Sequence, residues 1–307
     1  MQTTSSAVAV APAPAALSES PWHRALADFA TSRSAVVGIV ILAILVFAAV
    51  FAPFITPQNP YDLQQLNILN GHLKPGSRNA DSFLFLLGTD DQGRDIYSGI
   101  VYGLRTSLMI GFGCTAIALA IGILFGLVAA YVGGWVETVI MRLVDLQLSF
   151  PAMLIALILV SILGSGMDKV MIAVVAVQWA YYARTIRSAA LVERKKEYME
   201  AAKSLGLSNL RVLFNHLLPN SLPPLIVVAT INVAHAISLE ATLSFLGVGA
   251  PITHPSLGRL IANGYGYMLS GEYWISFFPG VVLLLTIVSI NLVGDQLRDV
   301  LNPRLKK

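Results

Sequence analysis

The dominant pattern along this chain is a series of long apolar runs separated by shorter polar segments. A membrane-spanning helix needs about 20 apolar residues to cross a hydrocarbon core of about 30 Å. Six such runs are predicted as spans, at about 34–55, 107–131, 139–163, 170–190, 223–246 and 275–297. The first run is too long for the core of a signal peptide and lacks a small-residue cleavage site, so it is predicted to be a retained anchor. The pattern therefore predicts an all-α integral membrane protein with six transmembrane helices.

Composition supports a membrane protein and excludes several other classes. Hydrophobic residues make up 56% of the 307 residues and charged residues 12%, against about 25% charged residues in soluble domains. The net charge is only +3, and no basic patch with interleaved aromatic residues indicates nucleic-acid binding. A single cysteine, Cys114, excludes an intrachain disulfide and a cysteine-based metal site.

Basic residues predict the orientation of the spans. With the N-terminus inside, 14 of the 20 lysines and arginines fall on the cytoplasmic side and six outside, as the positive-inside rule favours. Both termini are therefore predicted to be cytoplasmic. Residues 1–21 are rich in Ala, Pro, Ser and Thr, which indicates a disordered tail. Residues 22–32 are predicted to form a short interfacial helix.

The cytoplasmic segment 192–219 differs from a simple linker. Its first part is predicted to be a short helix with Tyr198, Ala201, Ala202 and Leu205 on one face, and Gly206 is placed to end it. Ser208 is positioned to cap a second helix, which Pro219 is expected to end. The apolar stripe predicted on that second helix is Leu210, Leu213, Phe214 and Leu217. Two interpretations fit these residues: a helix pair that docks another protein, and a helix pair resting on lipid headgroups.

A family resemblance favours the first interpretation. Glu200-Ala201-Ala202, three residues, Gly206 and then Leu218-Pro219 resemble the EAA loop of ABC-importer permeases, whose pattern is E-A-A-x3-G-x9-I-x-L-P. The sequence departs from this pattern once, because His216 stands where the family usually has Ile.

Other segments resemble the dipeptide and oligopeptide branch of the same family, and the likeness extends from about residue 22 onward. They are Leu87-Gly88-Thr89-Asp90-Asp91-Gln92-Gly93-Arg94-Asp95, Met141-Arg142-Leu143-Val144-Asp145 with Phe150-Pro151, Phe245-Leu246-Gly247, and the stretch from Asn291 to Leu305. The resemblance points to the second, C-type, permease of that branch. It implies a type I importer permease fold in a bacterial inner membrane. The chain is accordingly divided into a tail (1–21), an N-terminal region with the first span and an extracytoplasmic loop (22–104), a five-helix transporter domain (105–297) and a C-terminal tail (298–307).

The resemblance also implies partners and a role for the loop. Two permeases, here expected to be a heterodimer, form the path; two ATPase chains bind ATP and Mg²⁺; and an extracytoplasmic binding protein delivers the substrate. No P-loop motif occurs in this chain, so the chain is expected to be a transport subunit without cofactor or metal and not an enzyme. The residues expected to couple to the ATPase are Glu200, Ala201, Ala202, Lys203, Ser204, Leu205 and Gly206.

Polar residues within the spans are candidates for function, because such groups are costly in lipid. Asn232, His235 and Glu240 lie in the fifth span, and their spacing keeps them off one tight face. Glu240 has two interpretations: it lines the path, or it satisfies donors on a neighbouring helix. Asp145 is expected to pair with Arg142, and Arg184 and Arg187 to extend toward headgroups.

Two further features have structural explanations beside functional ones. The run of Asp90, Asp91 and Asp95 lacks the spacing of a calcium loop and is predicted to be a capped turn before a helix. Gly122 and Gly126 form a G-x-x-x-G pair, which fits either a seam between two permeases or packing within one bundle.

The sequence leaves more than one substrate and more than one class of transporter open. Peptides are the expected substrate, with nickel, glutathione or another small solute as alternatives within the family. A proton-coupled secondary carrier working alone is the alternative from another class, although no internal repeat supports it.

Overall fold

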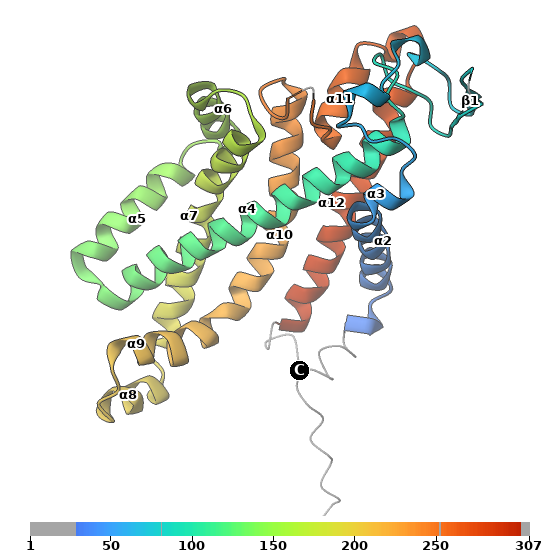
Figure 1. Ribbon diagram of the computed structural model, residues 1–307. Coiled ribbons are helices and arrows are strands. Elements are labelled where there is room, and N and C mark those ends of the chain that lie inside the picture. Colours follow the sequence, from blue (N-terminus) through green and yellow to red (C-terminus); the bar gives the residue numbers. More distant parts are fainter. Residues whose placement is uncertain (1–28, 81, 252, 302–307) are drawn as a thin grey trace, which may run out of the picture.

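Long helices cross most of the length of the molecule, and shorter elements cap both of its ends (Figure 1). The computed structural model describes residues 29–80, 82–251 and 253–301. The long helices are α2 (Arg33–Val50), α4 (Ile96–Val132), α5 (Gly134–Leu148), α6 (Ala152–Leu163), α7 (Met167–Glu193), α10 (Leu218–Phe245) and α12 (Trp274–Leu301). The predicted tail 1–21, most of the predicted helix 22–32 and the end of the C-terminal tail lie outside the described residues.

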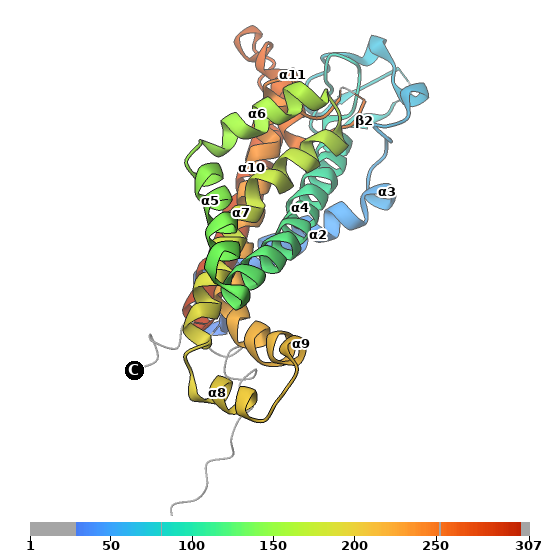
Figure 2. The same cartoon turned by 90° about the vertical axis from the view of Figure 1, so that its left-hand side faces the viewer.

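The short elements form two groups at opposite ends of the bundle (Figure 2). At one end are α8 (Glu197–Ser204), α9 (Asn209–Arg211) and a π-helical turn, Val212–Leu217. We call residues 193–217 the α8 corner. At the other end are α3 (Ala52–Ile55), α11 (Leu257–Tyr265), and residues 57–95, which we call the polar cap. The polar cap holds two antiparallel two-residue strands, β1 (Ser77–Arg78) and β2 (Leu84–Phe85), with Ser77 opposite Phe85.

The helix α4 begins well before the predicted second span. The side chain of Asp95 accepts a hydrogen bond from the Ser98 amide at 2.9 Å and caps the helix at Ile96. Residues 96–106 include the polar residues Ser98, Arg105 and Thr106, so this segment is less hydropathic than the run that follows it. The apolar pattern alone therefore does not reveal that the helix begins at Ile96. The capping residue Asp95 therefore marks the start of this helix, and the apolar run does not.

The third predicted span is not one continuous helix. It consists of α5 and α6, which are bent by 93° at the break between them. Pro151 precedes α6, and a proline disfavours helical conformation at the residue before it. Two helices, and not one, therefore make up the predicted span over 139–163.

Membrane-spanning character is distributed unevenly among the described helices. Four stretches are long and apolar enough to cross a membrane: α2, α4, the continuous stretch Asn209–Phe245, and α12. The pair α5–α6 passes the same test when it is taken as one span. The helix α7 has 27 residues but is more polar. The predicted count of six spans thus stays a prediction.

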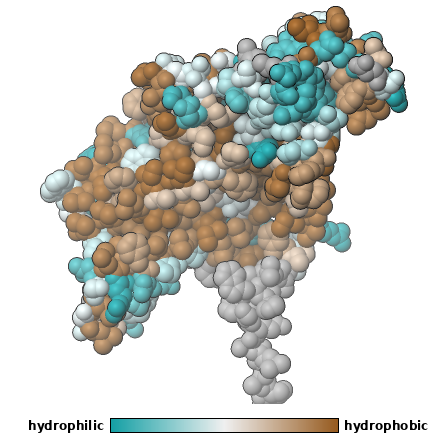
Figure 3. Space-filling view, in the orientation of Figure 1, coloured by the Kyte–Doolittle hydropathy of each residue, from teal (hydrophilic) through white to brown (hydrophobic). Residues whose placement is uncertain are grey.

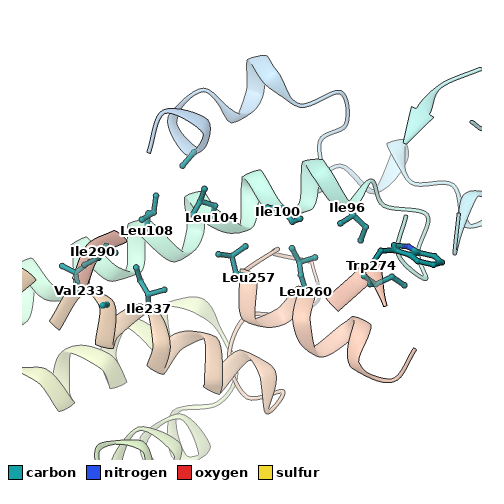
Figure 4. Close-up of a cluster of buried hydrophobic side chains, with 13 residues drawn as sticks. Ile96, Ile100, Leu104, Leu108, Val233, Ile237, Leu257, Leu260, Trp274 and Ile290 are labelled. Carbon is teal, nitrogen blue, oxygen red and sulfur yellow. The ribbon is translucent and has the colours of Figure 1, made fainter. Parts of the chain in front are cut away.

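The buried core runs along α4. Ile96, Ile100, Leu104 and Leu108 of α4 pack against residues of α10, α11 and α12, including Ile237, Leu257 and Trp274 (Figure 4). The most extensive helix contact is between α4 and α7. The pair Gly122 and Gly126 lies at this contact. A Cβ added to Gly122 would lie 2.4 Å from the Cβ of Tyr182, and one added to Gly126 2.2 Å from Ile186. The pair therefore serves packing within this bundle.

The surface is divided into zones. Apolar side chains cover the middle of the face drawn in Figure 3, while polar side chains gather over the polar cap and around the α8 corner. An apolar belt between two polar ends is the arrangement that a bilayer requires of a helical membrane protein.

Candidate functional site

The helix α8 ends where the sequence predicts. Gly206 has a φ of 70°, in the left-handed region that favours glycine. The amide of Leu207 donates to the carbonyl of Ala202 at 3.4 Å, and that of Leu205 to the carbonyl of Ala201 at 3.0 Å. The first of these bonds is the 6→1 bond of a Schellman motif. A Cβ at Gly206 would meet nothing within 4 Å, so the position requires a backbone conformation and not space.

The predicted apolar face of α8 is split between two sides. Met199 and Ala202 are buried, whereas Ala201 is exposed and Leu205 is 78% exposed. Glu200 and Ser204 are exposed as well, and Lys203 belongs to the same helix. The prediction that Ala201, Ala202 and Leu205 share one side is wrong, because the buried stripe of this two-turn helix is Met199 and Ala202, and Leu205 lies past its end. One side of α8 therefore packs against the rest of the protein, and the other side is exposed.

The second predicted helix of the corner does not end at Pro219. The chain continues from α9 through the π-helical turn directly into α10, and Pro219 lies in the first turn of α10. A proline lacks the N–H that a continuous helix would use at this position, and the π-helical turn just before it already shifts the backbone hydrogen bonds. The amide of Leu218 bonds to the carbonyl of Leu213, five residues back. Ser208 occupies the expected N-cap position, but its side chain makes no capping hydrogen bond.

The apolar stripe predicted on this second helix is also divided. Leu217 is buried and Leu213 half-buried, while Leu210 and Phe214 are exposed. Together with Leu205, the exposed Leu210 and Phe214 place large apolar side chains on the outside of the α8 corner. Exposed apolar patches rimmed by polar residues mark contacts with another protein or with a membrane.

Buried apolar contacts join the α8 corner to three long helices. Met199 and Ala202 belong to a single cluster with residues of α4, α7 and α10, and the other buried members are Leu127, Ala130, Ile186, Ala190, Val212, Leu217 and Leu225. A close-packed interior transmits displacement because it has little free volume. Movement of α8 is therefore expected to carry these helices with it.

Polar contacts secure the same junction. Arg194 donates to the carbonyls of Ala130 and Tyr131 in the last turn of α4, the second at 3.3 Å. A cation at the C-terminal end of a helix also interacts favourably with the helix dipole. Glu193 accepts from the hydroxyl of Tyr198 at 2.7 Å and from Lys196 at 2.7 Å. Burial, followed by the bond to Glu193 and its charge, raises the pKa of Tyr198 to about 12. This phenol therefore stays protonated and keeps its role as donor.

A cavity whose lining includes six polar side chains lies along α10 in the middle of the bundle. It has a volume of about 390 Å³, and it is lined from α6, α7 and α10 by Ala152, Met153, Val177, Gln178, Tyr181, Asn232, His235, Ser238, Leu239 and Thr242. The amide of Gln178 donates to the carbonyl of Asn232 at 2.8 Å. The structure thus brings Asn232 and His235 together at one cavity.

Sequence reasoning missed most of the polar residues in this cavity. Ser238 and Thr242 follow His235 by three and seven residues, which is the spacing of one helical stripe. This spacing in the sequence is enough to predict that Ser238 and Thr242 share a helix face with His235. Gln178 and Tyr181 come from α7, and no local pattern connects them to α10.

Glu240 lies apart from this cavity and is fully buried. Its carboxylate accepts from the hydroxyl of Ser107 on α4 at 3.2 Å and from that of Ser244 at 2.7 Å. The hydroxyl of Ser244 also accepts from the amide of Ala250 at 2.9 Å. Of the two interpretations for Glu240, these contacts match the one in which it satisfies donors on neighbouring elements.

Two ion pairs join α5 to α7 and correct expectations from the sequence. Asp145 pairs with Arg184 at 2.5 Å, not with Arg142 on its own helix, and Glu137 pairs with Arg187. The reason is that α5 packs along α7, which brings opposite charges on the two helices closer than the neighbours along one helix. Arg184 and Arg187 therefore bind carboxylates instead of extending to headgroups.

The aspartates of the polar cap form capped turns, as predicted. The carboxylate of Asp90 accepts from the amides of Gln92 at 2.9 Å and Arg94 at 2.8 Å, and Asp95 caps α4. Burial raises the pKa of Asp90, although the nearby Arg94 opposes the shift, and burial also raises the pKa of Asp95. These acids hold the turn that starts α4.

Comparison with known proteins adds family information. Residues 122–307 match the model of the family described as "Binding-protein-dependent transport system inner membrane component", and residues 20–75 match "N-terminal TM domain of oligopeptide transport permease C". The dipeptide transport system permease protein DppC of Alkalihalophilus pseudofirmus is 37% identical over 94% of this chain and 91% of its own. DppC of Escherichia coli K12 is 38% identical over 100% of this chain and 99% of its own.

A solved structure shares the fold. A chain from inward-facing conformations of the MetNI methionine ABC transporter aligns with a TM-score of 0.55 at 20% identity, over 66% of this chain and 96% of that one. This likeness concerns the arrangement of the helices. It identifies the all-helical bundle as a type I ABC permease fold.

Proposed function

We propose a function from the premise that this chain belongs to the family of binding-protein-dependent transport system inner membrane components. The chain forms one half of a transmembrane path for peptides, and it couples this path to cytoplasmic ATPase subunits through the α8 corner. The observation that carries the proposal is the division of α8 into a side buried in the bundle core and an exposed side.

The proposed topology has six spans with both termini in the cytoplasm. The spans are α2, α4, the bent pair α5–α6, α7, α10 and α12. The helix α7 is more polar than the others because it is covered by protein: it contacts α4, α5, α6 and α10, and its Gln178 and Tyr182 are buried. A span that does not face lipid has no need of a fully apolar surface.

Coupling uses the exposed residues of α8. Glu200, Ala201, Ser204 and Leu205 face outward on the short helix that ends at Gly206, and Lys203 lies on the same helix. The small side chain of Ala201 allows the backbone of a partner to approach closely. An ATPase groove that receives this face moves α8, and the buried cluster moves α4, α7 and α10 in turn, which is rigid-body coupling of a bistable bundle.

The path runs along the exposed stripe of α10. Asn232 and His235 line the cavity on this stripe, and the ten lining residues include no Asp, Glu, Lys or Arg. The hydroxyl, amide and imidazole groups among them can form hydrogen bonds with the peptide bonds of a substrate, and the family relatives are named for peptide transport. A second, non-identical permease closes the path from the other side, an extracytoplasmic protein delivers the peptide, and ATP and Mg²⁺ bind to the ATPase chains.

Purification of the tagged chain from its native membrane in mild detergent tests this proposal. The expected result is copurification of ATPase subunits and a second permease, together with ATP-dependent uptake of a labelled dipeptide by proteoliposomes of the complex. A chain that is isolated alone and carries out uptake driven by a proton gradient would overturn the proposal in favour of a secondary carrier.

A further inference from the structure

A groove lined by α2, α4, α10 and α12 lies away from the proposed path and from the α8 corner. Two cavities form it, with volumes of about 330 Å³ and 420 Å³, and Phe112 lines both. The first cavity is lined by Val46, Ala49 and Val50 of α2 and by Arg105, Leu108, Met109 and Phe112 of α4. The second cavity is lined by Leu42 of α2, by Phe112 to Leu119 of α4, and by residues of α10 and α12 such as Ile226 and Ile290. The two cavities adjoin at Phe112, and we treat them as one elongated apolar groove.

The groove has the length of a lipid chain. From Arg105 to Leu119, which lies in the second cavity, α4 advances about 21 Å at about 1.5 Å per residue. One leaflet contributes about 15 Å of hydrocarbon, so a tilted groove of this length spans its depth. The hydroxyl groups of Thr115 and Thr230 in the second cavity are bonded to Gln178 and to the carbonyl of Ile226. The walls therefore offer mainly methyl, methylene and ring surface.

Arg105 is the charged residue of the groove and stands at its end. It is exposed, and within residues 29–80, 82–251 and 253–301 it has no hydrogen bond or ion pair. Val50, the last residue of α2, lines the same cavity. Close to this end, the hydroxyl of Tyr61 lies 3.1 Å from that of Thr106, the residue after Arg105. Tyrosine is enriched at the membrane–water interface, so Arg105 lies at the depth of lipid phosphates.

We propose that this groove binds a glycerophospholipid of the outer leaflet. The guanidinium of Arg105 pairs with the phosphate, for which its planar fork is suited, and one acyl chain lies along Leu108, Met109 and Phe112 toward Leu119. This proposal rests on the membrane orientation given under the proposed function. It goes beyond that function because it assigns a ligand to a face that lies outside the path.

A photo-cross-linker in place of Met109 identifies what occupies the groove. Met109 is 60% exposed and lines the first cavity, so benzoylphenylalanine at this position reacts with the nearest occupant in intact membranes. The expected product is the chain with the added mass of one phospholipid. R105Q is expected to lower the yield by about tenfold, because it removes a charge-assisted interaction, and R105K is expected to keep most of the yield. K74Q, which changes an exposed cation outside the groove, is the control.

Three outcomes would overturn the proposal: a cross-link to another polypeptide, the absence of a lipid adduct, and an adduct yield that R105Q leaves unchanged. The first would assign the groove to a neighbouring permease. Peptide uptake measured on the same membranes separates this proposal from the proposed function, since uptake without a lipid adduct contradicts only the lipid site, and an adduct without uptake contradicts only the transport role.

Discussion

The two ends of the bundle differ in the groups that are buried where each end joins it. The α8 corner is joined to α4, α7 and α10 through buried apolar side chains such as Met199 and Leu217. The polar cap packs Leu87 against the core, but it also joins the bundle through hydrogen bonds and buried carboxylates: the indole of Trp274 donates to the carbonyl of Thr89 at 3.3 Å, and the buried Asp95 caps α4. Apolar packing is sensitive to volume, whereas buried carboxylates are sensitive to pH. The two ends should therefore respond to different perturbations.

The largest effect is expected from charges placed on the two sides of α8. A201R adds a large cation to the exposed side and should abolish ATP-driven uptake, with a decrease of at least about 100-fold if the contact contributes about 3 kcal/mol. The variant should still insert and keep its thermal stability, because Ala201 is not part of the buried cluster. Uptake and thermal unfolding of the complex are the measurements.

A202R is the matched comparison for that variant. Ala202 is buried, so the same substitution places an unpaired charge in the core of the corner and should destabilise the chain itself. If A201R and A202R destabilised the chain equally, the division of α8 into a buried and an exposed side would be wrong.

The next effect in size concerns volume in the α8 corner. M199A removes a fully buried side chain and is expected to cost about 2–5 kcal/mol. Hydrogen exchange should localise the loss to α8 and the adjoining ends of α4 and α7. L205A, at an exposed position of the same corner, should leave stability nearly unchanged, and a comparable loss in that variant would contradict the assignment of faces.

The third comparison separates conformation from space at Gly206. G206V forces a β-branched residue to adopt a positive φ and should cost about 1–2 kcal/mol of local stability, with a loss of coupling between ATP hydrolysis and uptake. G206N should be milder, because Asn adopts the left-handed region more readily. ATPase activity and uptake measured together give the coupling ratio. Equal behaviour of the two variants would indicate that side-chain size, not φ, decides the position.

The fourth prediction concerns pH and the polar cap. Burial raises the pKa of Asp90 above its ordinary value of 3.8, so the folded state binds the proton more tightly than the unfolded state. The stabilisation from this group is complete below pH 3.8 and is lost as the pH rises through the folded pKa. D90N keeps an acceptor for the amides of Gln92 and Arg94 and should reduce this dependence. Thermal unfolding of wild type and D90N across pH 4–8 is the measurement, and identical pH profiles would contradict it.

The smallest effect is expected at the ion pair between α5 and α7. Asp145 and Arg184 have side chains that are 57% and 49% exposed, so D145N should change stability by less than about 1 kcal/mol. E137Q should have a larger effect, because Glu137 and Arg187 are less exposed. A double-mutant cycle for each pair measures the coupling energies, and a stronger coupling in the exposed pair would reverse this ranking.

The sequence predicts the features of this fold that local patterns determine. The apolar runs locate the long helices, Gly206 marks the end of α8, and Asp95 marks a capped start. The bend at Pro151 and the continuation through Pro219 were not anticipated. Both features depend on which backbone hydrogen bonds the proline removes. A proline breaks a helix in one context and is accepted near the start of a helix in another.

Residue positions within the candidate site depended on tertiary contacts. The buried side of α8 is set by the helices it packs against, so eight residues of local sequence were insufficient to identify it. Asp145 has Arg142 nearby in sequence and Arg184 nearby in space, and the second determines its partner. In the same way, Asn232 and His235 reach one cavity because α10 is packed against α6 and α7, while Glu240 faces Ser107 on α4.

Site-directed cross-linking from α8 is the most direct test of the central claim, which is that the exposed side of this helix docks the ATPase. The single native cysteine, Cys114, is fully buried, so a cysteine introduced on α8 reports without a competing thiol. In the assembled transporter, A201C and L205C should cross-link to the ATPase subunit, and M199C, on the buried side, should not. If A201C and L205C gave no ATPase adduct, or if M199C gave the same adduct, the coupling role of α8 would be contradicted.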